Sequence, residues 1–182
     1  VILKDGIPAI SSDGVDDFMS ISNGETFFST EFSAFSVFAY KVKSAQQRFY
    51  SYSNGAQSSG SYNLLLLRKN GSNMEFLGTT DNPLRNITVQ ISNSQDLVRL
   101  VTSHLGKEND NIRGKTDTSS VVNAAIGNFI GISQEGYNWN LFSARNATTH
   151  AETLSQQFVF YDSDKTSNIQ DIENEIKTTF NI

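Results

Sequence analysis

Apolar residues in this sequence occur in short runs separated by clusters of Gly, Asn, Asp and Ser, with a turn signal about every 8–12 residues. Residues 32–43 form the most regular run. On an extended chain Val37 and Ala39 point one way, whereas Phe38, Tyr40 and Val42 point the other. Both faces of this run are apolar, which predicts a central strand. Further strands are predicted at residues 48–52, 64–67, 74–77, 87–91 and 97–105.

The C-terminal stretch, residues 157–182, has a different pattern. It opens with a run of apolar and aromatic residues at 158–161, which predicts a strand covered on both faces. Ile169, Ile172 and Ile176 then recur at helical spacing. They predict one amphipathic helix over residues 168–177, with Glu173 and Glu175 on its exterior. The pattern therefore predicts an all-β chain, a sandwich or barrel, with one short C-terminal α-helix.

Length and composition narrow the classes of function. The 182 residues suffice for one domain with a sizeable core. The net charge is −5 and no basic stripe occurs, which argues against a nucleic-acid partner. No apolar run approaches the roughly 20 residues that a membrane-spanning helix needs. The absence of Cys excludes a disulfide scaffold and thiolate metal sites.

Two parts of the sequence resemble a known family. The segments SSDGVDDFMSI and FSVFAYKVK are similar to the opening of concanavalin A-like jelly-roll domains of the laminin-G-like type. The matching positions are Asp13, Gly14, Asp16, Asp17 and Phe18, whereas Ser12 stands where the family usually has Phe. Residues 158–182 look like the closing segment of laminin-G-like domains in proteins of Bacteroidetes and their bacteriophages.

The resemblance implies a two-sheet antiparallel jelly roll, with residues 1–182 as a single domain in the C-terminal part of a longer chain. It also implies a non-catalytic, lectin-like module, displayed on a bacteriophage spike or fibre or on a cell surface. Such a module would bind host or environmental glycan, contact other virion or surface proteins, and form a homo-oligomer. Two alternatives stay open: a purely structural decoration domain that contacts only protein, and a glycan-degrading enzyme.

The sequence offers no catalytic constellation. Glycosidases of this fold carry acidic residues that alternate along one strand, because alternate residues face the cleft together. No such run of acids occurs here. His104 and His150 lie far apart in the sequence and do not suggest a pair. We therefore predict a protein without enzymatic activity.

Asp13, Asp16 and Asp17 form a candidate calcium site. Clustered carboxylates on a turn suit a hard cation, which prefers oxygen ligands. The competing interpretation is that the three residues cap and tighten a β-turn without any ion.

Residues 136–140 combine aromatic rings with amides, the mixture that sugar recognition uses. Tyr137 and Trp139 alternate around Asn138, so their rings are predicted to face the same side as an exposed two-ring platform. Asn138 and Asn140 would then hydrogen-bond to sugar hydroxyls. The competing interpretation is that Trp139, the only Trp of the chain, is a core anchor.

A second candidate ligand patch consists of Arg48 and Tyr52, in an aromatic-rich predicted strand. The competing interpretation is that these two are ordinary strand residues without a ligand. Contact with partners is expected mainly at loops, because loops vary without disturbing the core. The candidate loops are residues 54–61, 106–120 and 136–140.

Overall fold

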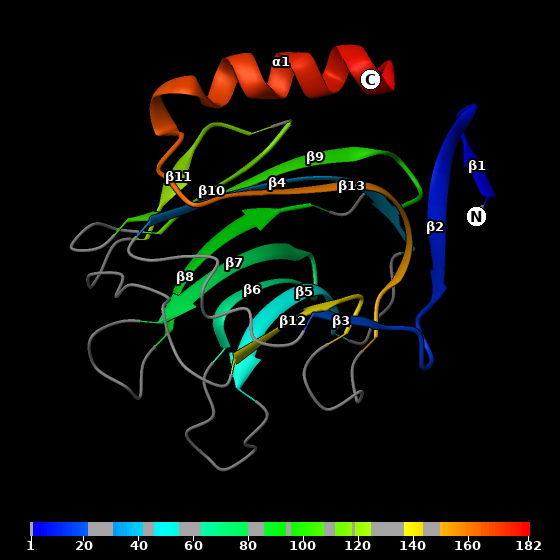
Figure 1. Cartoon of the computed structure of the whole chain (residues 1–182), viewed down its shortest axis with the longest axis horizontal. Helices are drawn as coiled ribbons and strands as arrows, with labels where there is room; N and C mark the ends of the chain where they lie inside the picture. Colours follow the sequence, from blue (N-terminus) through cyan, green and yellow to red (C-terminus); the bar gives the residue numbers. More distant parts are fainter. Residues whose placement is uncertain are drawn as a thin grey trace.

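The structure of the chain is a computed structural model in which two antiparallel sheets face each other and one helix covers the outside of one sheet (Figure 1). Within the described residues, no helix combines the length and the apolar character needed to cross a membrane. The structure describes residues 2–21, 31–41, 46–54, 63–79, 86–93, 96–107, 112–117, 119–124, 137–143 and 150–182.

Each sheet joins hairpins of consecutive strands with strands from distant parts of the sequence. The seven-stranded sheet consists, in spatial order, of β1 (Ile2–Lys4), β2 (Ile7–Asp13), β13 (Glu152–Tyr161), β4 (Glu31–Tyr40), β9 (Leu100–Lys107), β10 (Arg113–Thr116) and β11 (Val122–Asn123). The six-stranded sheet consists of β3 (Met19–Ile21), β12 (Tyr137–Leu141), β5 (Gln47–Asn54), β6 (Asn63–Asn70), β7 (Asn73–Thr79) and β8 (Asn86–Ser92). Strand β13, for example, lies between β2 and β4, and β12 lies between β3 and β5. The predicted two-sheet jelly-roll sandwich is confirmed.

The main core lies between the two sheets and is rich in aromatic rings. Strand β4 shows why residues 32–43 are apolar on both faces. Phe38 and Tyr40 point into the main core, whereas Phe35 and Val37 point to a second apolar cluster on the outside of the same sheet. The prediction of a central strand is confirmed, because β4 lies between β13 and β9.

The second cluster forms under the C-terminal helix α1 (Ile169–Phe180), which follows a 3₁₀ turn at Thr166–Asn168. Ile176 and Phe180 are buried against the sheet, and Ile169 and Ile172 are partly buried beside them. The predicted docking face of the helix is therefore confirmed. The prediction for Glu173 is wrong: its side chain is buried rather than on the exterior.

Glu173 is buried because the sheet under the helix supplies partners for its carboxylate. Ser103 Oγ on β9 donates a hydrogen bond of 2.6 Å to Oε1. Lys115 on β10 forms an ion pair with Oε2. Both partners lie on strands whose outer face the helix covers, so this polar contact fixes the helix at one position on the sheet.

Part of the loop predicted at residues 106–120 is structured. Strand β10 pairs with β9 inside it, and Ile112 and Thr116 are fully buried. Gly114 lies against the ring of Phe76 from the other sheet. A Cβ atom at this position would come within 2.5 Å of that ring, so the close approach requires glycine. Of the predicted loop at residues 54–61, Asn54 ends β5 and residues 55–61 lie outside the described residues.

Candidate functional site

The predicted aromatic platform at residues 136–140 is not present on the surface. Trp139 is only 6% exposed and belongs to the main core. Its ring lies 4.5 Å from the ring of Phe160 and 5.0 Å from the ring of Tyr52. The reason is register, because Trp139 pairs with Tyr52 across β12 and β5, on the face that points inward. Tyr137 contributes its backbone to β12, and its side chain lies outside the described residues.

Tyr52 is fully buried as well, so the predicted patch of Arg48 and Tyr52 is wrong for its aromatic member. Asn138 and Asn140 alternate with Trp139 and therefore lie on the outer face of the six-stranded sheet. Asn138 is half-buried and Asn140 is buried. Of the predicted glycan-contacting residues, Arg48 is the one that belongs to the site described below.

A row of four polar side chains crosses the outer face of the six-stranded sheet. Arg48 on β5 pairs with Arg68 on β6, Arg68 pairs with Glu75 on β7, and Glu75 pairs with Gln90 on β8. Directly paired residues in antiparallel strands project to the same face, so the four side chains are neighbours. The residues flanking Arg68, Glu75 and Gln90 in sequence point inward. We call these four residues the arginine row.

Glu75 anchors the arginine row. Its side chain is only 3% exposed, and Arg68 Nε forms an ion pair with Oε2. Asn70 Nδ2 and Gln90 Nε2 donate hydrogen bonds of 3.1 and 3.0 Å to Oε1. The carboxylate is thus held by three donors from two neighbouring strands. A carboxylate satisfied in this way has little capacity left for a further cation.

Arg48 has no such anion among the described residues. Its Nε is buried without a hydrogen-bond partner in the described part of the chain, and its Nη2 donates a long bond of 3.5 Å to Gln46 Oε1. Burial lowers the pKa of the Arg48 guanidinium, and the charge of Arg68 lowers it further. The arginine row therefore holds two guanidinium groups and one carboxylate, and the unbalanced positive charge lies at Arg48. Such a group favours an incoming anion.

The surroundings of the arginine row decide where a ligand can approach. Leu66 and Leu77 occupy the same outer face but are buried, so that part of the face is covered. In the other direction, toward the β6–β7 turn, Asn70 and Ser92 are exposed and Asn73 is half-buried. Where side chains are described, the accessible part of this face is a strip of amide, hydroxyl and guanidinium groups. We call the arginine row together with Asn70, Asn73 and Ser92 the polar strip.

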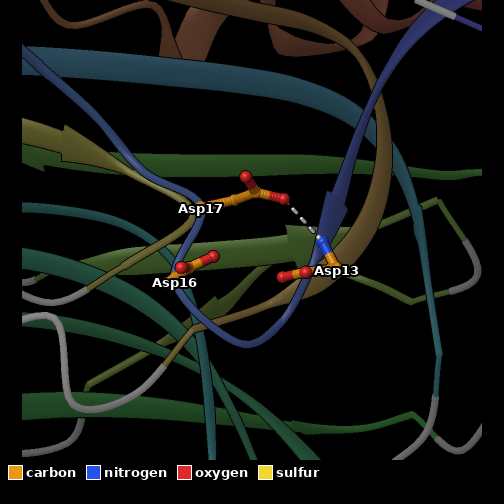
Figure 2. A group of neighbouring side chains, drawn as sticks. All are labelled: Asp13, Asp16 and Asp17. Carbon is orange, nitrogen blue, oxygen red and sulfur yellow. Dashed lines mark hydrogen bonds between the residues drawn. The ribbon is translucent and has the colours of Figure 1, made fainter.

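Asp13, Asp16 and Asp17 do lie together, at the end of β2 and in the turn that leads to β3 (Figure 2). One carboxylate oxygen from each lies within 4.8 Å of the others, and all three residues are exposed. Asp13 N donates to Asp17 Oδ2 at 2.9 Å, and Val15 N donates to Asp13 Oδ1 at 2.7 Å. These bonds stabilise the turn without an ion, so calcium binding stays a proposal.

The sequence matches no protein-family model and no curated protein. Solved structures do match the fold. The CBM40 module of the Ruminococcus gnavus IT-sialidase bound to α2,6-sialyllactose has a TM-score of 0.68 and 13% identity over 90% of this chain and 94% of the module. The same module bound to α2,3-sialyllactose gives a TM-score of 0.66 and 12% identity over 90% and 93%.

The NanB sialidase of Streptococcus pneumoniae has a TM-score of 0.67 and 11% identity over 91% of this chain, which corresponds to 27% of that enzyme. At such identities the likeness establishes the fold alone. The chain has the β-sandwich jelly-roll fold of these lectin-like modules. The narrower laminin-G-like resemblance and the bacteriophage setting do not follow from these neighbours.

Proposed function

We propose that this chain is a non-catalytic carbohydrate-binding module whose polar strip binds a glycan bearing a carboxylate. The observation that carries this proposal is Arg48, a partly buried guanidinium with no anion beside it in the described part of the chain. A sugar carboxylate can accept two parallel hydrogen bonds from one guanidinium, which a neutral hydroxyl cannot. The structurally similar CBM40 module was solved with bound sialyllactose, a glycan that carries a carboxylate, and this supports the same ligand class.

The rest of the polar strip suits a sugar. Asn70, Asn73 and Ser92 offer amide and hydroxyl groups, and sugar rings carry hydroxyls that donate and accept hydrogen bonds. Glu75 would hold Arg68 and Gln90 in position rather than contact the ligand, since it is buried and already bonded to both. This arrangement presents a preorganised surface with its charge at one end.

The six strands described for this sheet favour binding over hydrolysis. They contain one carboxylate, Glu75, whereas hydrolysis of a glycosidic bond commonly requires two placed across the bond. Glu75 is also held by Arg68, Asn70 and Gln90, so its carboxylate is engaged within the sheet and not free to act on a glycosidic oxygen. A glycan-degrading activity is therefore the weaker alternative.

The setting of the module belongs to the same proposal. The resemblance to laminin-G-like domains suggests display on a virion, such as a bacteriophage spike or fibre, or on a cell surface, in several copies and beside other surface proteins. The alternative is a decoration domain that contacts protein only. Failure of the chain to bind any acidic glycan, together with a stable homo-oligomer in light scattering, would favour that alternative.

The proposal is tested by titrating the protein with sialyllactose and with lactose in a calorimeter. Sialyllactose should bind and lactose should bind at least about tenfold more weakly, because one charge-assisted contact contributes about 1.5–3 kcal/mol. Arg48→Gln should remove this preference. Lys107→Gln is the matched control, since it removes the same charge from an exposed side chain on the other sheet. Equal binding of both sugars, or equal effects of both variants, would refute the assignment.

A further inference from the structure

A cleft of about 380 Å³ opens between the two sheets, on the side where β2 and β3 lie. Apolar residues from both sheets form most of its wall: Pro8, Ala9, Ile10, Met19, Leu141, Phe142 and Phe158. Ser155, Gln156 and Gln157 of β13 complete the wall. None of them belongs to the polar strip. The volume falls in the range of small-ligand pockets.

An irregularity in β13 produces this cleft. Strand β2 begins at Ile7, but its pairing with β13 ends where Ile10 meets Ser155. At the same point the register of β13 against β4 shifts between Ser155 and Gln157, which leaves Gln156 as a bulge. A bulge bends its strand and ends regular pairing. The two strands therefore separate, and the gap between them is part of the fold.

The side chain of the bulged residue keeps the gap open. Gln156 Nε2 donates hydrogen bonds of 3.1 Å to Lys4 O and 3.3 Å to Ile7 O, which ties the β1–β2 hairpin to β13 at this spacing. Both hydrogens of this amide are thereby used. The Oε1 of Gln156 and the Oε1 of Gln157, which also lines the cleft, are buried without a hydrogen-bond partner in the described part of the chain, so each can accept a hydrogen bond from a hydroxyl of a ligand.

The mouth of the cleft carries two exposed apolar side chains. Ile10 is 45% exposed and Met19 is 49% exposed, one on each sheet. Covering such side chains is favourable by about 25 cal/mol for each Å² removed from water. A peptide strand is a poor occupant, because Pro8 lacks the N–H that an added strand would need from β2. The shape and chemistry favour a small molecule with an apolar body.

We infer that this cleft binds the apolar part of a small amphipathic ligand, of the class of alkyl or aryl glycosides, and leaves the polar head group at the mouth. Such a ligand packs against Phe142 and Phe158, whose rings contact each other edge to face, and covers Ile10 and Met19. This site goes beyond the proposed glycan contact at Arg48, and neither depends on the other.

The probe for the test is n-octyl β-D-glucopyranoside, kept below its micelle-forming concentration, with methyl β-D-glucopyranoside as the ligand without an apolar tail. In methyl NMR spectra the octyl glycoside should shift the signals of Ile10 and Met19 in a saturable way. The methyl glycoside should leave them unchanged at the same concentration. Absence of saturable shifts with the octyl glycoside, or equal shifts with both, overturns the inference.

Two substitutions on one strand then locate the site. Met19→Glu places a charge at the mouth and should weaken binding of the octyl glycoside at least tenfold. Ile21→Glu, the same change on the same strand at a residue that is 64% exposed and outside the cleft, should change it less than twofold. Equal losses in the two variants overturn the inference. Ile10→Glu gives a second test from the opposite wall, and Arg48→Gln should leave this binding unchanged even if sialyllactose binding is lost.

Discussion

The outer faces of the two sheets hold their charges in opposite ways. Helix α1 covers the outside of the seven-stranded sheet (Figure 1). It packs on Phe35, Val37 and Val101, and its buried Glu173 is paired with Lys115. On the six-stranded sheet, the arginine row ends at Arg48, whose Nε has no partner among the described residues. One face is closed by matched charges, and the other leaves a cation unmatched.

Under the proposed function, the two outer faces divide stability from ligand binding. A buried charge whose partner is removed destabilises the fold, because the remaining ion is left desolvated. A charge that already lacks its partner contributes no such stabilisation, and it can gain one from a ligand. We call the outer face under helix α1 the closed face and the outer face of the six-stranded sheet the open face. Removing a charge should therefore weaken folding on the closed face and weaken ligand binding on the open face.

The largest effect is expected at Glu173. Glu173→Gln should lower the free energy of unfolding by about 3–5 kcal/mol, because Lys115, whose side chain is only 13% exposed, loses its anion. Urea unfolding measures this. Glu175→Gln, on the exposed side of the same helix, is the control and should stay within about 0.5 kcal/mol of the parent protein.

A double variant sharpens this test. Glu173→Leu combined with Lys115→Met replaces both ions with apolar groups, which is often neutral or stabilising for buried pairs. The free energy of unfolding should then return to within about 1 kcal/mol of the parent value. If Glu173→Gln alone costs less than about 1 kcal/mol, the closed face does not depend on this ion pair and the contrast between the faces fails.

The stability of the core between the two sheets should depend on pH. Burial lowers the pKa of His104 from 6.5 to about 3, and Tyr50 Oη lies 2.7 Å from its Nδ1. Between pH 6.5 and pH 3 the unfolded chain binds a proton at this residue and the folded chain does not. Stability should therefore fall as pH falls, by about 1.4 kcal/mol for each pH unit from this residue alone.

Urea unfolding between pH 6.5 and pH 5 checks the prediction for His104, with an expected loss of about 2 kcal/mol from this group. His104→Gln should be less stable near neutral pH, since the ring contacts with Phe32 and Phe76 are lost. Its stability should, however, depend less on pH over this interval. Parallel pH dependences in the two proteins would contradict the assignment.

Much of the closed face could be predicted from the sequence. The apolar alternation around Val37 and Phe38 indicated a strand with two buried faces, and the isoleucine spacing indicated the docked helix. Strand β10 could not be recognised in the same way. Arg113 and Lys115 alternate there with Gly114 and Thr116, and the apolar pattern is absent because Lys115 serves the buried Glu173.

The open face was harder to predict because alternation does not say which side is buried. Tyr137 and Trp139 were expected on one side, yet only the pairing of Trp139 with Tyr52 shows that Trp139 points inward. One pairing was within reach of the sequence, because the turn residues around Gly71 predict a hairpin, and a two-residue turn at Gly71 and Ser72 sets the register that pairs Arg68 with Glu75. Arg48 joins them only through pairing between more distant strands, which one sequence does not fix.

A small effect on stability is expected at Arg48, in contrast to Glu173. Arg48→Gln should change the free energy of unfolding by no more than about 0.5 kcal/mol, because no described anion loses its partner. Urea unfolding, carried out beside the sialyllactose titration, separates the two readouts. A loss of more than about 2 kcal/mol would show that Arg48 supports the fold, and would remove the distinction between the two faces.

The smallest effect is expected from calcium at Asp13, Asp16 and Asp17, which lie outside both faces. Two of their carboxylate oxygens already accept backbone hydrogen bonds, and all three residues are exposed. A weak extracellular-type site with a dissociation constant near 1 mM would add only about 0.4 kcal/mol at 1 mM calcium. Unfolding in 1 mM CaCl₂ and in EDTA should therefore differ by no more than this. A larger difference that Asp16→Asn abolishes would establish a calcium site, because the amide keeps the shape of the side chain and removes its charge.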